Sequence, residues 1–178
     1  MKWSLLAMLI ACSGAQNTES SSEPSSEASS EPSSEASTEP SSEDPIAMDV
    51  YINELVAKSD VTADWIELYN AGSSSIDVSG CTLEDSGGEP WELPAGTEIA
   101  AGGFLLIWAD DGAEGEGLHA PFKLSKDGEE LLFKDAQEYI LDQVSSPELA
   151  AEEAYARVTD GGDEWEIRTE STPEASNN

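Results

Sequence analysis

The segment WIELY, residues Trp65–Tyr69, carries the clearest signal of the fold class. Its apolar residues alternate, and in a strand Ile66 and Leu68 point to one face while Trp65 and its alternate neighbours point to the other. The residues Asn70–Ser73 that follow supply turn chemistry. This pattern predicts a short β-strand that has one apolar face and ends in a tight turn.

Similar short apolar runs recur from Ile46 to the end of the sequence, and turn-forming residues separate them. The predicted strands are Val50–Val56, Ile76–Val78, Cys81–Leu83, Trp91–Leu93, Phe104–Trp108, Glu130–Lys134, Tyr139–Val144, Tyr155–Val158 and Trp165–Ile167. The unbroken apolar run Phe104–Trp108 is expected to be buried on both sides or to lie at the centre of the sandwich. Only Ser146–Ala154 could form a short helical turn. Strands of this length, with turn signals about every 8–12 residues, indicate an all-β sandwich or barrel.

The charge balance excludes several classes of function. The 178 residues include 38 acids, seven Lys or Arg and one His, which gives a formal net charge of −31. Nonspecific binding to nucleic acid is excluded, because it rests on Lys and Arg that neutralise phosphates. Direct docking of the surface onto anionic lipid is disfavoured for the same reason. Two cysteines, Cys12 and Cys81, are too few for a disulfide framework or a multi-cysteine zinc site.

Residues 1–11 are predicted to be a signal peptide. One Lys is followed by about nine mostly apolar residues, a run too short to cross a bilayer. The next stretch, Leu9–Cys12, resembles the lipobox of bacterial lipoproteins, and the resemblance implies that Cys12 receives a diacylglycerol and becomes the mature N-terminus. Ordinary secretion, with cleavage after the small residues Ser13–Ala15, is the alternative. The first interpretation makes this an exported lipoprotein anchored in the bacterial cell envelope, with the outer membrane or cell surface as an open location.

Residues 12–45 are predicted to comprise the lipidated Cys12 and, after it, a disordered acidic linker of Ser, Glu and Pro. The segment Ser13–Pro45 carries eight acids and no base, and an eight-residue unit repeats three times within it between Ser21 and Asp44. Such a segment cannot bury enough apolar surface to offset its chain entropy. Proline and like charges favour extended conformations, so we expect a stalk that lifts the domain of residues 46–178 from the membrane. Glycosylation of its Ser or Thr residues is a second interpretation.

The domain resembles a known family. The segments Ile52–Leu55 and Asp64–Asn70 are similar to the opening of the lamin tail domain, an immunoglobulin-like β-sandwich. The likeness continues through Val78–Leu83, Leu93–Thr97, Phe122–Ser125, Gly128-Glu129, Trp165 and Thr172-Pro173. Cys81 stands where bacterial relatives often carry Trp, and Glu174 stands where Gly commonly follows Thr-Pro. The resemblance implies a lamin-tail-type sandwich over residues 46–178 with an adhesive or docking role, and it brings no catalytic constellation.

The residues offer few candidates for catalysis. His119 is expected in a loop before a strand, and no Gly-x-Ser-x-Gly elbow accompanies it. Cys81, between Gly80 and the β-branched Thr82, is interpreted as a small core residue. Asp64 and Glu67 lie three apart in one strand and point to opposite faces, so they do not form a carboxylate pair. Glu67 is expected to bond to backbone donors or to face water, and no catalytic residue is predicted.

One acidic loop is a candidate calcium site. Four carboxylates, those of Asp110, Asp111, Glu114 and Glu116, lie in the glycine-rich stretch 109–117, and Ca²⁺ prefers six to eight oxygen ligands in flexible geometry. The spacing does not match an EF-hand loop, and a solvated acidic loop is the alternative. The stretch Asp160–Glu164 is a weaker second candidate. No other cofactor is expected.

These observations favour a non-catalytic, envelope-anchored lipoprotein that displays a binding or adhesion domain on a flexible stalk. The expected partners are the membrane, through the N-terminal lipid, and an envelope or extracellular protein or glycan that is basic, neutral or bridged by cations. No nucleic acid and no small-molecule substrate are expected. The alternatives are an enzyme acting on envelope polymers and a purely structural spacer. From Ile46 on, 30 acids stand against six bases, so self-repulsion also favours a saline or divalent-rich habitat.

Overall fold

The computed structural model describes residues 48–178. The predicted signal peptide of residues 1–11 and the predicted linker of residues 12–45, with Cys12, lie outside the described residues. The described part contains strands and no helix. The twelve strands are β1 (Val50–Val56), β2 (Asp64–Asn70), β3 (Ile76–Asp77), β4 (Thr82–Asp85), β5 (Trp91–Glu92), β6 (Glu98–Ile99), β7 (Phe104–Ala109), β8 (Leu118–Ala120), β9 (Glu129–Lys134), β10 (Ile140–Ser146), β11 (Ala154–Arg157) and β12 (Trp165–Arg168).

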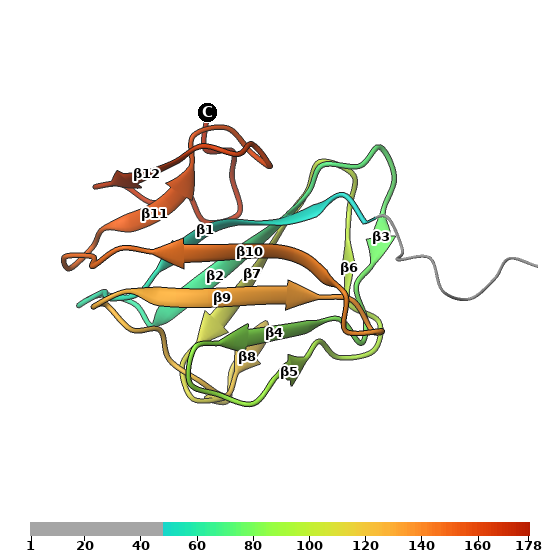
Figure 1. Cartoon of the computed structure of the whole chain (residues 1–178), viewed down its shortest axis with the longest axis horizontal. Coiled ribbons are helices and arrows are strands. Elements are labelled where there is room, and N and C mark those ends of the chain that lie inside the picture. Colours follow the sequence, from blue (N-terminus) through green and yellow to red (C-terminus); the bar gives the residue numbers. More distant parts are fainter. Residues whose placement is uncertain (1–47) are drawn as a thin grey trace, which may run out of the picture. The chain divides into compact units, whose positions relative to one another are not determined.

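The strands form two main sheets and a small third one (Figure 1). The larger sheet has the order β12-β11-β1-β2-β7-β8, and the second has the order β10-β9-β4-β5. The short strands β3 and β6 pair with each other. Pairing is antiparallel except between β7 and β8. One core cluster contains buried side chains from both main sheets, so the prediction of an all-β sandwich is confirmed.

The alternation in Asp64–Asn70 decides how the larger sheet is buried. Ile66 and Leu68 enter the core cluster, where they share the space between the sheets with Leu83 and Phe133 of the second sheet. Trp65 belongs to a separate cluster on the opposite face, which we call the outer face. The prediction that Ile66 and Leu68 lie on one face of β2 and Trp65 on the other is therefore confirmed. Both faces of this strand are buried along most of its length.

The strand β7 is less buried than its sequence suggests. Phe104–Trp108 was expected to be covered on both sides, but only Ile107 within this run is buried. Leu106 and Trp108 lie half-buried against Trp65 on the outer face, because no second sheet covers that face. The expectation of burial on both sides is therefore wrong for the outer half of the strand.

Two connections differ from the expectation. Ser146–Ala154 contains no helical turn: β10 continues to Ser146, and a loop follows in which the fully buried Leu149 donates its N–H to the Lys126 carbonyl at 2.8 Å. His119 was expected in a loop, but it lies in β8, which pairs with β7. Neither a single buried residue such as Leu149 nor a three-residue strand such as β8 produces a recognisable period in the sequence, so the pattern did not predict them. Within residues 48–178, no helix is long and apolar enough to cross a membrane.

Candidate functional site

A bulge in β1 places two carboxylates side by side in the larger sheet. The register of β1 against β2 shifts between Ile52 and Glu54, so Asn53 is the extra residue. As a result Glu54 lies directly opposite Glu67, and both side chains are fully buried on the outer face. Buried like charges that face each other across a ladder are costly, so these two carboxylates need partners.

The partners come from the segment that follows β12. Thr172 donates its backbone N–H to both carboxylate oxygens of Glu54 at 3.2 and 3.1 Å, and its hydroxyl donates to Oε2 at 2.9 Å. The Glu174 N–H donates to Oε2 of Glu67 at 2.5 Å. Asn53 donates from Nδ2 to Oε1 of Glu67 at 3.4 Å. We call residues 169–178 the strap, because they are held over the outer face by these bonds.

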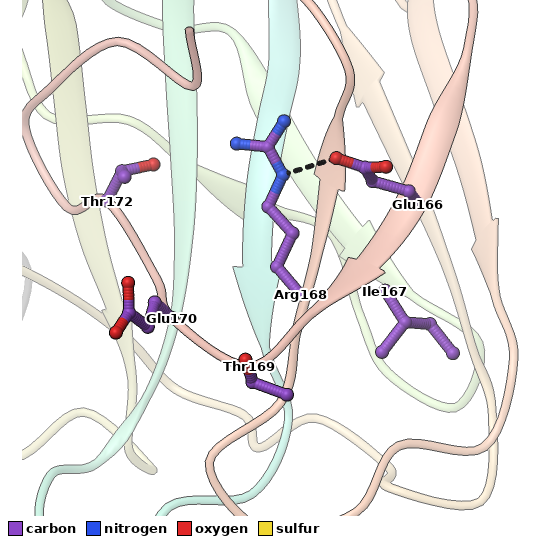
Figure 2. A pocket seen from close by; sticks show the side chains of 6 residues that line it. All are labelled: Glu166, Ile167, Arg168, Thr169, Glu170 and Thr172. Atoms are coloured by element: carbon purple, nitrogen blue, oxygen red, sulfur yellow. Dashed lines mark hydrogen bonds and ion pairs between the residues drawn. The ribbon is translucent and has the colours of Figure 1, made fainter.

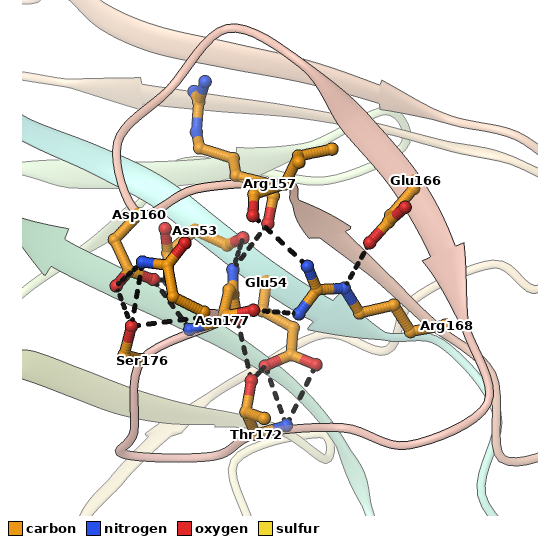
Figure 3. A network of polar contacts seen from close by, with 11 residues as sticks. Asn53, Glu54, Arg157, Asp160, Glu166, Arg168, Thr172, Ser176 and Asn177 are labelled. Atoms are coloured by element: carbon orange, nitrogen blue, oxygen red, sulfur yellow. Dashed lines mark hydrogen bonds and ion pairs between the residues drawn. The ribbon is translucent and has the colours of Figure 1, made fainter.

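Further polar contacts fix the far end of the strap (Figure 3). Asn177 is buried, and its Nδ2 donates to the carbonyls of Asn53 and Arg157 at 3.3 and 3.0 Å. Its backbone N–H donates to Oδ1 of Asp160 at 2.9 Å, and its carbonyl accepts from Arg168. The strap is thus bonded to β1, β11 and the loop between β11 and β12. This network is an integral part of the domain, and it uses polar groups that strand alternation alone would assign to solvent.

Burial changes the acidity of both carboxyls. Burial raises the pKa of Glu67 to about 7, although the bonds from Glu174 and Asn53 act in the opposite direction. Burial also raises the pKa of Glu54 from its ordinary value, against the two bonds from Thr172. Near neutral pH the Glu67 carboxyl therefore exists in both protonation states. Each carboxylate is occupied by donors of the domain itself, which leaves neither of them directed at a substrate.

Arg157 joins the two main sheets. Its Nε donates to the Ile52 carbonyl at 2.7 Å, its Nη2 donates to Oδ2 of Asp142 in β10 at 2.7 Å, and its Nη1 bonds to the Gly162 carbonyl. Asp142 Oδ2 also accepts the Ile52 N–H at 2.8 Å. The guanidinium lies 4.7 Å from the ring centroid of Trp165. This single buried side chain therefore connects β1, β10, β11 and the start of β12.

The strand β12 forms one edge of the larger sheet, where it pairs with β11 on one side only (Figure 1). Beside it lies an open hollow of about 440 Å³, lined by Glu166, Ile167, Arg168, Thr169, Glu170 and Thr172 (Figure 2). Arg168 donates from Nε to Oε1 of Glu166 at 2.8 Å and from Nη2 to the Val158 carbonyl. Glu170 also lines the hollow, and its side chain is exposed.

In the predicted calcium loop, two carboxylates contact basic side chains and two face solvent. Oδ2 of Asp110 lies 2.8 Å from Nδ1 of His119, and Oδ2 of Asp111 lies 2.8 Å from Nζ of Lys123. Glu114 and Glu116 are exposed. Among residues 48–178, no three His, Cys, Asp or Glu side chains are grouped so as to hold a metal ion. Calcium binding by Asp110, Asp111, Glu114 and Glu116 stays a prediction.

The other residues considered as candidate catalytic or metal-binding groups are buried or are hydrogen-bonded to other parts of the domain. Cys81 is buried as predicted, and burial raises the pKa of its thiol to about 11. Oδ2 of Asp64 accepts the Leu124 N–H at 3.3 Å, whereas Glu67 accepts the Glu174 N–H of the strap, so the two carboxylates have separate partners. In the weaker acidic stretch 160–164, Oδ1 of Asp160 accepts hydrogen bonds from Nδ2 of Asn53 and from the Asn177 N–H.

Sequence reasoning missed the cluster of Asn53, Glu54 and Glu67 and the open edge at β12. The available signal was a polar pair, Asn53-Glu54, in the middle of the apolar run Val50–Val56. Two consecutive polar residues break a strict alternation, and this break marks the bulge. The partners in the strap are more than 100 positions away in sequence, as for Thr172 and Glu54 with a separation of 118. No local pattern could connect them.

Comparison with protein families matches the Lamin Tail Domain over residues 45–148. The match covers β1 to β10 and ends before β11 and β12, although β11 pairs with β1 in the same sheet. A comparison with curated proteins finds no match to the chain.

Proposed function

This chain belongs to the lamin tail domain family, and on that premise we propose that it is a non-catalytic docking protein anchored in a bacterial cell envelope. In this proposal Cys12 carries the lipid, residues 13–45 form the stalk, and the sandwich binds another macromolecule. The anchoring rests on the sequence Leu9–Cys12 after a short apolar run, and the stalk rests on the repetitive acidic composition of the linker.

The observation that supports docking over catalysis is the use of the two most buried carboxylates. A general acid or base must reach the substrate within hydrogen-bond distance. Glu54 and Glu67 instead accept bonds from Thr172 and Glu174 of the domain itself. Elsewhere in the domain, the thiol of Cys81 is buried and has a raised pKa, which is the opposite of an activated nucleophile. These groups support the sandwich and leave recognition to its exposed edges and loops.

The lipid anchor is tested by following a labelled fatty acid in a diderm bacterium that expresses the chain. We expect label and membrane association in the wild type, loss of both in Cys12→Ala, and no loss in Cys81→Ala, which removes the other thiol. A wild-type chain that remains unlabelled and soluble would contradict the anchor, and the domain would then be a secreted binding protein.

The docking role is tested with the Cys12→Ala chain immobilised and exposed to envelope extracts, with a synthetic peptide of residues 13–45 as the control surface. We expect capture that saturates and that free chain competes away. Capture equal on both surfaces would contradict docking and favour a spacer. Turnover of an envelope polymer that is lost on replacing a specific carboxylate would contradict the non-catalytic role.

A further inference from the structure

We propose that the open edge of β12 is a strand-addition site for an extended basic segment of a partner protein, in which Lys or Arg alternates with apolar residues. This inference rests on the proposed docking function and names its surface and the chemistry of its partner. It is carried by the backbone register of β12, by the side chains on its two faces and by the charge around it.

The backbone register leaves alternate groups of β12 facing outward. The Val158 N–H donates to the Glu164 carbonyl at 2.7 Å, and hydrogen-bonded pairs alternate along an antiparallel ladder. Since Ala156 pairs with Glu166 and Ala154 with Arg168, the backbone groups of these two β12 residues point to β11. Those of Trp165 and Ile167 point away from the sheet, to the side where a further strand would bind.

The two faces of β12 differ in chemistry. Ile167 and Trp165 lie on the inner face, where Trp165 stacks on Tyr155 with ring centroids 5.0 Å apart. Ile167 is 46% exposed, one of four large apolar side chains with high exposure among the described residues. Glu166 and Arg168 occupy the outer face. An added strand would thus place alternate side chains against Ile167 and Trp165, and the others against Glu166.

The charge around β12 indicates which side chains of an added strand should face Glu166. Residues 159–178 carry six acids and one base, Arg168. That base is already used, because it bonds to Glu166, Val158 and Asn177. The exposed carboxylates of Glu164 and Glu170 have no cationic partner among the described residues. The hollow beside β12 contains Glu166 and Glu170, and a Lys or Arg side chain complements it.

Other occupants and other edges fit less well. A second copy of the domain would bring the same negative balance to the edge. The opposite edge strand, β8, has only three residues. On the second sheet, β10 faces β1, since Asp142 accepts the Ile52 N–H. Within residues 48–178, the edge of β12 combines outward backbone groups, an exposed apolar side chain and carboxylates without a cationic partner.

The test uses the Cys12→Ala chain and an eight-residue synthetic peptide of alternating Lys and Val, with binding followed by fluorescence anisotropy. A peptide of the same composition with its Lys and Val residues in two blocks controls for charge alone. The key variants are Ile167→Lys and Ile140→Lys, which introduce the same charge on strands β12 and β10 at side chains 46% and 55% exposed. Circular dichroism and thermal melting establish that both variants fold.

We expect saturable binding of the alternating peptide, at least about tenfold weaker binding by Ile167→Lys, and less than about twofold change in Ile140→Lys. Equal binding of the two peptides, an equal loss in both variants, or a concentration-dependent dimer that excludes the peptide would overturn the proposal. Saturable capture of an envelope partner that Ile167→Lys leaves unchanged would also overturn it, while leaving the docking function in place. Absence of such capture, with the peptide still bound at β12, would remove the docking function alone.

Discussion

Glu54 and Glu67 are direct cross-strand partners in the middle of the larger sheet, and both are fully buried. The bulge at Asn53 creates this pair, and the strap of residues 169–178 supplies the donors that make it tolerable. The carboxylates thereby hold the strap, and the strap is continuous with the edge strand β12. The packing of the edge strand β12 thus depends on two buried carboxyls of the domain.

The buried pair predicts an inverted pH dependence of stability. The pKa of Glu67 is about 7 in the folded domain and near 4.5 when unfolded, so the folded state binds the proton more tightly between these values. The contribution of the Glu67 carboxyl to the free energy of unfolding is therefore greatest below pH 4.5. It is lost as the pH rises towards 7, which lowers the free energy of unfolding by about 3 kcal/mol. Glu67→Gln should match the wild type at low pH and exceed its free energy of unfolding at pH 8.

The control for this prediction is Glu130→Gln, which removes one charge from an exposed position of β9. Urea unfolding at several pH values measures both variants. The general relief of repulsion at low pH affects both equally, so the difference between them reports the buried carboxyl. If the two variants show the same pH profile, the assignment of the raised pKa to Glu67 is wrong.

Glu174 predicts a stabilising substitution. Its φ angle is 59°, in the left-handed region that favours glycine, where a side chain costs about 1 kcal/mol. Glu174→Gly should keep the N–H bond to Glu67 and raise the free energy of unfolding by about 0.5–1 kcal/mol. The matched change Glu170→Gly removes the same charge at an ordinary φ and should not stabilise. A destabilised Glu174→Gly would mean that its side chain contributes more than its backbone costs.

The contacts of Arg157 predict that replacing it with lysine lowers the free energy of unfolding. Arg157→Lys keeps the charge, but one ammonium cannot serve acceptors on Ile52, Asp142 and Gly162 together. We expect destabilisation of about 1–3 kcal/mol by urea unfolding. In a double-mutant cycle with Asp142→Asn, the two losses should be less than additive because the residues share a contact. Full additivity would show that the sheets are not joined through this pair.

The fold could be predicted from the sequence because strand alternation and turn residues are local signals. Val50–Val56 became β1 with the predicted bounds, and the predicted strand Trp65–Tyr69 lies within β2, which extends one residue further at each end. The two-residue strand β6 and the strand β8 were missed because so few residues carry no period. The burial of Glu67 could not be predicted, since it depends on a bulge one strand away and on the strap.

The acidity of the domain predicts stabilisation by salt. From Ile46 on, 30 acids and six bases repel one another, and about 1 M salt shortens the screening length to about 3 Å. The melting temperature should rise between low and near-molar NaCl. Chloride is preferable to sulfate here, because sulfate also strengthens apolar burial by exclusion. An unchanged melting temperature would contradict self-repulsion as a limit on stability.

The most direct test of the central claim is hydrogen exchange of the individual β12 amides, measured by NMR with and without the alternating Lys–Val peptide. In the free chain, the amides of Glu166 and Arg168 should be protected and those of Trp165 and Ile167 should exchange rapidly. We expect the peptide to slow exchange at Trp165 and Ile167 and to leave Glu166 and Arg168 unchanged. Protection that appears elsewhere in residues 48–178, with Trp165 and Ile167 still exchanging rapidly, would contradict it.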